Sequence, residues 1–248
     1  HILGLFRLWW IPVGGPPTEG AYVTYDHEAM VGILALEAQR AGAVVVGEDL
    51  GTFEPWVQDY LARRGLLGTS ILWFEQQDGA PRPPREYRVR CLTSVNTHDL
   101  PPTAGYLTGV HLDLRERLGL LAGDAEAERE RAGEERDAFI RAARQDGFLP
   151  RDQAPDLSSP EGLADVVVAL HRYLAQAPSM LHGVALVDAV GEKRIQNQPG
   201  TTQDQYPNWE IPLADHEGRA VLIDDLDRVP GFARLLDAVD DALAHGTP

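Results

Sequence analysis

Apolar runs alternate with helical patterns along the first hundred residues of this chain. Within residues 26–41 the apolar side chains recur at helical spacing and Gly42 follows as a stop, which predicts a helix. The same reasoning predicts helices over 55–64, 161–177 and 232–244 and strands over 43–46, 70–74, 87–95 and 184–187. Residues 1–20 are rich in aromatic and turn-forming residues and predict a long loop. Strands and helices in this order are typical of an α/β fold with a parallel sheet or a barrel.

The segment 111–145 has a different character, being rich in Arg, Glu and Ala. It predicts solvated helices with breaks at Gly119, Gly123 and Gly133. A loop follows, and Ser159-Pro160 resembles a helix start. We expect residues 111–160 to be a helical insertion within one unit, residues 1–248, and not a separate domain.

Charge and cysteine content narrow the classes of partner. The chain has 248 residues, 44% hydrophobic, with 38 acidic against 22 basic side chains and a formal net charge of −16. The negative electrostatic field of such a chain repels phosphate backbones and anionic membranes, so we expect neither nucleic acid nor a membrane as partner. Binding of a neutral sugar is not affected by this field. A single cysteine, Cys91, fits a cytoplasmic protein and reads as a small buried hydrophobe. Residues 1–15 lack a signal-peptide pattern, and no apolar stretch has the length of a membrane span.

Two β-branched runs end in carboxylates. Residues 44–51 read VVVGEDLG, and residues 94–99 read SVNTHD. Catalytic groups of strand–helix folds cluster at the carboxyl ends of buried strands, so Glu48 and Asp99 can face one another across a sugar-sized gap. Taken alone, Glu48 could be an acid favouring a helix N-terminus, Asp49 is its rival, and Asp99 could cap a turn.

Several motifs occur in an order typical of one enzyme family. They are GEDLG at 47–51, NTHD at 96–99, NQPGTT at 197–202, YPNW at 206–209 and FRLWWIP at 6–12. Together they resemble the amylomaltase or 4-α-glucanotransferase family, also called disproportionating enzyme. The resemblance implies the C-terminal part, or second half, of an α-amylase-type (β/α)₈ barrel. It also implies a transferase that moves α-1,4-glucan segments between maltooligosaccharides with retention of configuration.

The resemblance also implies roles for individual residues. Glu48 matches the acid/base, Asp99 the transition-state stabiliser, and His98 a ligand of sugar hydroxyls. His1 matches the histidine that follows the nucleophilic Asp of the family, and is a further substrate-binding candidate. The nucleophile is therefore expected directly upstream of residue 1, and this chain alone is expected to be inactive.

Further candidate substrate-binding residues come from the same motifs. Trp10 matches a sugar-stacking position, Asn197 a substrate-binding or loop-anchoring position, and Asp49 lies beside the acid/base. Trp10 and Asn197 also have purely structural interpretations, Trp10 as a core aromatic and Asn197 as a turn former. Trp209 is expected to pack the C-terminal loop against the barrel.

Other functions remain open at this level. The chain could be a non-catalytic glucan-binding module, or an α-amylase-like hydrolase, because motifs do not report whether water or a sugar is the acceptor. The eight histidines show no metal-ligand spacing, no phosphate-binding glycine motif occurs, and the chemistry requires no cofactor. We therefore expect no metal and no cofactor, with an α-glucan as the partner; the sequence does not indicate an oligomeric state.

Overall fold

The computed structural model describes residues 1–245, which divide into two compact units. The first unit comprises His1–Ser70, Arg88–Leu92 and Ser179–Leu181, and the second comprises the other described residues. Within residues 1–245, no helix has both the length and the apolar character needed to cross a bilayer.

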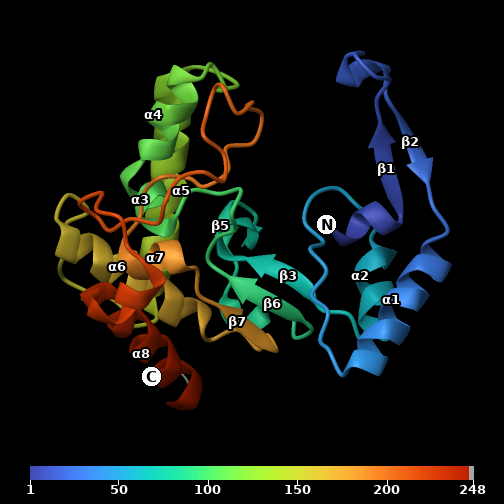
Figure 1. The fold of residues 1–248 in the computed structure, drawn as a ribbon. Coiled ribbons are helices and arrows are strands. Elements are labelled where there is room, and N and C mark those ends of the chain that lie inside the picture. Colours follow the sequence, from blue (N-terminus) through green and yellow to red (C-terminus); the bar gives the residue numbers. More distant parts are fainter. Residues whose placement is uncertain (246–248) are drawn as a thin grey trace. The chain divides into compact units, whose positions relative to one another are not determined.

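The first unit begins with a 3₁₀ turn (Ile2–Leu5), which a β-hairpin follows. Strand β1 (Arg7–Trp10) pairs antiparallel with β2 (Ala21–Thr24) (Figure 1). In this pairing Trp10 lies opposite Ala21. The prediction of a long loop over residues 1–20 is therefore wrong. The turn-forming residues occupy the connection, which contains a 3₁₀ turn (Pro17–Glu19). The Trp9 indole of β1 donates to the carbonyl of Pro17 at 3.0 Å and ties the strand to this turn.

Two helices of the first unit form where the sequence predicts them. Helix α1 (His27–Ala41) begins after Asp26, whose carboxylate accepts from the Ala29 amide at 3.1 Å, and ends at Gly42 in the left-handed conformation. Helix α2 spans Trp56–Arg63. The strand predicted over 43–46 is reduced to a parallel bridge between Val46 and Leu67.

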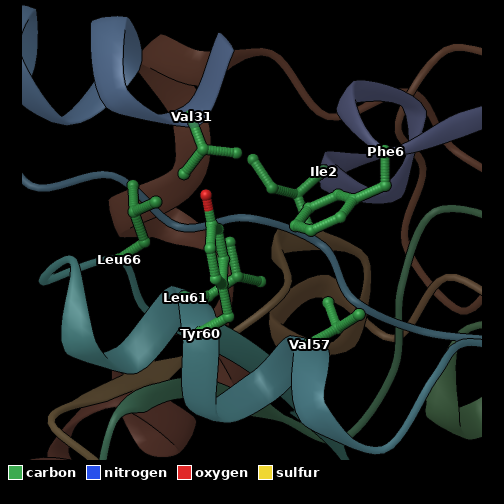
Figure 2. Close-up of a cluster of buried hydrophobic side chains, with 7 residues drawn as sticks. All are labelled: Ile2, Phe6, Val31, Val57, Tyr60, Leu61 and Leu66. Atoms are coloured by element: carbon green, nitrogen blue, oxygen red, sulfur yellow. The ribbon is translucent and has the colours of Figure 1, made fainter. Parts of the chain in front are cut away.

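A hydrophobic cluster joins these elements. Its side chains come from the first residues of the chain, from α1, from α2 and from one residue of the segment after α2 (Figure 2). They are Ile2, Phe6, Val31, Val57, Tyr60, Leu61 and Leu66. Burial of such side chains contributes about 1.5–3 kcal/mol each, so the start of the chain is fixed in this core.

Strands β3 (Gly68–Ile71), β6 (Cys91–Ser94) and β7 (Leu181–Gly183) form a sheet in the order β3-β6-β7. Cys91 is buried, as predicted. All three strands are shorter than, or displaced from, the predicted runs. Residues Leu72–Phe74 form a 3₁₀ turn. A small antiparallel ribbon of β4 (Gln76–Gln77) and β5 (Ala80–Pro81) follows it, and a second 3₁₀ turn spans Pro84–Glu86. The strand predicted over 184–187 is wrong, because α7 (Leu186–Val190) begins there.

The second unit is mainly helical. Its other helices are α3 (Thr103–Thr108), α4 (Val110–Arg117), α5 (Ala125–Gln145), α6 (Pro160–Leu174) and α8 (Pro230–His245), with a 3₁₀ turn at Ile223–Arg228. Helix α5 packs against α4 and α6, and α8 packs against α6 and α7 (Figure 1). Phe139, Val166, Leu170 and Leu235 are buried in this unit.

The helix start predicted at Ser159 is confirmed in this unit, whereas the breaks predicted at glycines are confirmed only in part. The Ser159 hydroxyl accepts from the Gly162 amide at 3.1 Å and begins α6, as predicted. Gly119 and Gly123 lie between α4 and α5, but Gly133 lies inside α5. A break at Gly133 is wrong, because its neighbours are strong helix formers that continue the helix. The insertion over 111–160 stays a prediction; its helices belong to the second unit.

Candidate active site

The predicted site residues fall into two sets, one in each unit. His1, Trp10, Glu48 and Asp49 belong to the first unit. His98, Asp99 and Asn197 belong to the second.

Glu48 directly follows the parallel bridge of the first unit. The Gly47 amide donates to the carbonyl of Leu67 at 2.8 Å, and the Glu48 carbonyl accepts from the Ile2 amide at 2.9 Å. A Cβ at Gly47 would lie only 2.8 Å from the Ile2 Cβ, so this close approach requires glycine. The Glu48 side chain is half-buried, and within residues 1–245 its carboxylate makes no hydrogen bond or ion pair.

Asp49 has the opposite environment. Its buried carboxylate accepts from Arg88 Nη1 at 2.6 Å and Nη2 at 3.1 Å, and from the Thr69 amide at 2.8 Å. Burial alone would raise the pKa of Asp49, but the hydrogen bonds from Arg88 and Thr69 and the guanidinium charge outweigh it and lower that pKa. A Cβ at Gly68 would lie 2.6 Å from Asp49 Oδ2, so glycine there makes room for the pair. These contacts support a structural role for Asp49 in fixing the turn after Glu48.

The remaining members of the first set are exposed. His1 precedes Ile2, whose side chain is in the core and whose amide donates to Glu48. Trp10 is 58% exposed on β1, and its indole nitrogen donates to the Tyr25 hydroxyl at 2.8 Å. The core-packing interpretation of Trp10 is therefore wrong, and its exposed ring is fixed in orientation.

In the second unit the structure brings His98, Asp99 and Asn197 together. Asn197 Nδ2 donates to Asp99 Oδ1 at 2.5 Å, although the two residues are 98 positions apart in the sequence. His98 Nε2 lies 3.4 Å from Asp99 Oδ2, and both side chains are about half exposed. The Thr97 hydroxyl accepts from the Asp99 amide at 3.2 Å and shapes the turn. A carboxylate held on one side and open on the other can face a bound ligand.

The two late motifs form one loop that reaches this carboxylate. Asn208 joins them: its Oδ1 accepts from the Gln198 amide at 2.7 Å, and its Nδ2 donates to the Thr201 hydroxyl at 2.9 Å. The next residue, Trp209, has a positive φ of 64°, and its ring centroid lies 5.0 Å from that of His98.

Trp209 is a site residue that the sequence reasoning missed. The sequence suggested only that it packs the C-terminal loop, whereas its side chain is 63% exposed and its ring lies beside that of His98. Its place in the YPNW motif was a signal, but the contact with His98 depends on folding.

A pocket of about 390 Å³ opens beside this cluster within the second unit. It is lined by Thr97 and His98, by Gln196 and Trp209, and by the largely apolar residues 183–187. This volume lies within the range of small-molecule sites. Aromatic and apolar walls with a few polar groups suit a sugar ring, which has apolar faces and a hydroxyl rim. Within residues 1–245, no group of three or more His, Cys, Asp or Glu side chains could hold a metal ion.

Comparison with known proteins establishes the family. The model of glycoside hydrolase family 77, described as 4-alpha-glucanotransferase, matches residues 1–217. This chain belongs to that family. The 4-alpha-glucanotransferase of Mycobacterium tuberculosis (strain H37Rv) is 57% identical over 244 residues, which cover 96% of this chain and 33% of the relative. The Haemophilus influenzae protein of the same name is 32% identical over 215 residues, 86% of this chain and 31% of that protein. The chain thus spans about a third of the length of these relatives.

Solved structures of the family confirm the fold class. The amylomaltase from Corynebacterium glutamicum matches with a TM-score of 0.89 at 52% identity, over 96% of this chain and 34% of that one. An amylomaltase from Streptococcus agalactiae in complex with acarbose matches with a TM-score of 0.63 at 15% identity, over 97% and 40% of the two chains, and supports the fold alone. The family member described here is an α/β protein and forms part of a TIM barrel.

Proposed function

We propose that this chain contributes the acid/base and the transition-state carboxylate of a 4-α-glucanotransferase, which moves α-1,4-glucan segments between maltooligosaccharides by retaining double displacement. The observation that carries the proposal is the cluster at Asp99. Two regions about 100 residues apart in the sequence meet there, with Asn197 holding one carboxylate oxygen and His98 beside the other. Membership of the family supports the reaction class.

Glu48 is proposed as the acid/base. In the first step it protonates the glycosidic oxygen that leaves, and in the second it takes the proton from the 4-hydroxyl of the incoming sugar. Its half-buried carboxylate has no partner within the described residues, so it is available for both transfers. Asp49 is held ionised by Arg88 and is unsuited to donating a proton. Neighbouring acids with different environments thus have different roles.

Asp99 is proposed as the stabiliser of the oxocarbenium-like transition state. A carboxylate fixed in advance near the anomeric carbon favours the positive charge that develops there. The hydrogen bond from Asn197 restricts its orientation, and His98 is placed to bind a ring hydroxyl. The exposed ring of Trp209 offers an apolar face beside the pocket. Trp10 and His1 remain proposed substrate contacts on the first unit.

Double displacement also requires a nucleophile about 5–5.5 Å from the acid/base. The reaction is therefore proposed for a polypeptide that also supplies this nucleophile. The substrate class is neutral, which suits a chain of net charge −16. A cytoplasmic location is proposed from the single cysteine.

The test is a chimera in which this chain replaces the region that it matches in the M. tuberculosis 4-alpha-glucanotransferase, incubated with maltotriose. Glucose together with maltooligosaccharides longer than the substrate is the expected result, because transfer lengthens one chain as it shortens another. Shorter products alone would indicate a hydrolase. Binding of maltotriose without any turnover would contradict the proposed reaction and favour a glucan-binding module.

A further inference from the structure

Asp188 is a buried carboxylate of the second unit that has no place in the reaction described above. It lies in α7, only 5% exposed. Asn96 Nδ2 donates to both of its oxygens, at 3.0 and 2.9 Å. The Thr103 amide donates to Oδ1 at 2.7 Å, and the Thr103 hydroxyl donates to Oδ2 at 2.6 Å. His171 Nε2 lies 3.3 Å from Oδ2 without hydrogen-bond geometry.

These donors mark the two ends of one loop. Asn96 is the residue before Thr97-His98-Asp99, and Thr103 is the first residue of α3. Asn96 Nδ2 also donates to the Thr103 hydroxyl at 3.2 Å, which joins the ends directly. Between these buried ends, His98 and Asp99 are about half exposed. The position of the exposed part therefore depends on the anchoring of both ends.

The other loop of the candidate site is anchored next to the same helix. Glu192 follows α7 by two residues, is buried, and accepts from the Arg194 amide at 2.9 Å and from the Ala214 amide at 3.2 Å. Residues 194–214 include Asn197 and Trp209, so this carboxylate holds the start and the end of that loop. The segment 186–192 thus supports both loops that meet at Asp99.

We propose that Asp188 is a positioning residue, which sets the place of Asp99 and His98 by holding Asn96 and Thr103 on one carboxylate. The catalytic consequence rests on the proposed transferase function, whereas the anchoring itself does not. A buried carboxylate that accepts several hydrogen bonds holds its donors in place, because each donor that moved away would be left unsatisfied in the interior. An Asp188→Asn change keeps the shape but replaces one oxygen by an amide that donates, and so places two donors face to face at Asn96.

Hydrogen–deuterium exchange on the chimera tests the anchoring. Asp188→Asn is expected to speed exchange in peptides covering residues 96–103 by about tenfold, the effect of a loss near 1.4 kcal/mol. Glu128→Gln is the matched control: Glu128 is also buried in the second unit and accepts from two backbone amides, of Ala122 at 2.8 Å and Gly123 at 3.0 Å. That variant is expected to speed exchange near residues 122–123 and to leave 96–103 unchanged.

Kinetics with maltotriose test the consequence. We expect Asp188→Asn to lower kcat by about 10- to 100-fold with KM changed less than about threefold, because misplacing a catalytic group by about 1 Å costs on that scale. Glu128→Gln is expected to keep both parameters. If Asp188→Asn does not fold, Thr103→Val removes the hydroxyl donor alone and is expected to act in the same direction more weakly.

The outcomes separate the two proposals. A wild-type chimera without transfer would contradict the proposed function, while exchange at 96–103 would still decide the anchoring. Unchanged exchange at 96–103 in Asp188→Asn and Thr103→Val would overturn the positioning role. Asp188→Asn could speed exchange at 96–103 and yet keep the kcat and KM of the Glu128→Gln control. That result would overturn the link between this anchoring and the function of Asp99.

Discussion

At the residue scale, adjacent carboxylates in this chain have unlike surroundings. Asp49 is buried against Arg88 and Thr69, whereas Glu48 is half-buried without a partner among residues 1–245. The sequence left both as candidates for the acid/base, because Arg88 is 39 residues away and its approach depends on folding. The family motif, and not the local pattern, favoured Glu48.

The Asp49–Arg88 pair predicts a dependence of stability on pH. The pKa of Asp49 is lower in the folded state than the unfolded value near 3.9, so its contribution is complete above that value and is lost as the pH falls through the folded pKa. Asp49→Asn is expected to lower the free energy of unfolding by about 3 kcal/mol at pH 7. The difference from wild type should shrink below about pH 4, as measured by urea unfolding at several pH values.

Glu48→Gln is the matched control for that measurement, because it removes the neighbouring carboxylate, which has no hydrogen-bond or ion-pair partner among residues 1–245. It should leave stability and its pH dependence close to those of the wild type. A difference between Asp49→Asn and wild type that stays constant from pH 7 to pH 3 would contradict the assigned contribution of Asp49.

Asn197 gives a second prediction at this scale. Its amide holds Asp99 at 2.5 Å, and hydrogen bonds to charged groups are worth about 1.5–3 kcal/mol. Because the pair is partly exposed, Asn197→Ala in the chimera should lower kcat for maltotriose by about tenfold, the low end of that range. Gln203→Ala, which removes a donor to the Asn208 carbonyl in the same loop, should keep kcat; equal losses in both variants would argue for general loosening of the loop.

At the element scale, helices were predictable where their signals are local. Asp26 and Ser159 cap their helices with their own side chains, and Gly42 ends α1 by adopting a positive φ. The strands were less predictable because each is at most four residues long and depends on a remote partner. The hairpin of β1 and β2 was missed for this reason, since the sequence shows its turn residues but not its pairing.

Two helical glycines allow a paired prediction. A Cβ at Gly105 in α3 would lie 2.2 Å from the carbonyl oxygen of Lys193, so Gly105→Ala should destabilise the protein by about 1–3 kcal/mol. At Gly133 in α5 the Cβ position is open, its nearest atom being the Arg136 guanidinium at 3.9 Å. Gly133→Ala should therefore stabilise by about 0.5–1 kcal/mol. Thermal unfolding of both variants checks whether the first substitution lowers stability and the second raises it. Destabilisation by Gly133→Ala would contradict the continuity of α5.

At the scale of the whole molecule, the order of the motifs determined the family correctly. The motif match assigned His98, Asp99 and Asn197 to one site, and the structure brings the three side chains together, while their roles stay predictions. Trp209 and Asp188 were not assigned to it, because one is recognised by its contact with His98 and the other by burial against Asn96 and Thr103. Neither contact leaves a periodic pattern in the sequence.

The central claim is that Glu48 transfers the proton in a retaining reaction, and azide rescue of Glu48→Gln in the chimera tests it most directly. Turnover of maltotriose should fall by about 10²- to 10⁴-fold, the usual contribution of an acid/base. With α-maltosyl fluoride, fluoride leaves without protonation and azide attacks without a base, so azide should restore turnover and yield the α-glycosyl azide. Asp99→Asn should be slow with either donor and should not respond to azide. Normal transfer from maltotriose by Glu48→Gln, with no response to azide, would contradict the account.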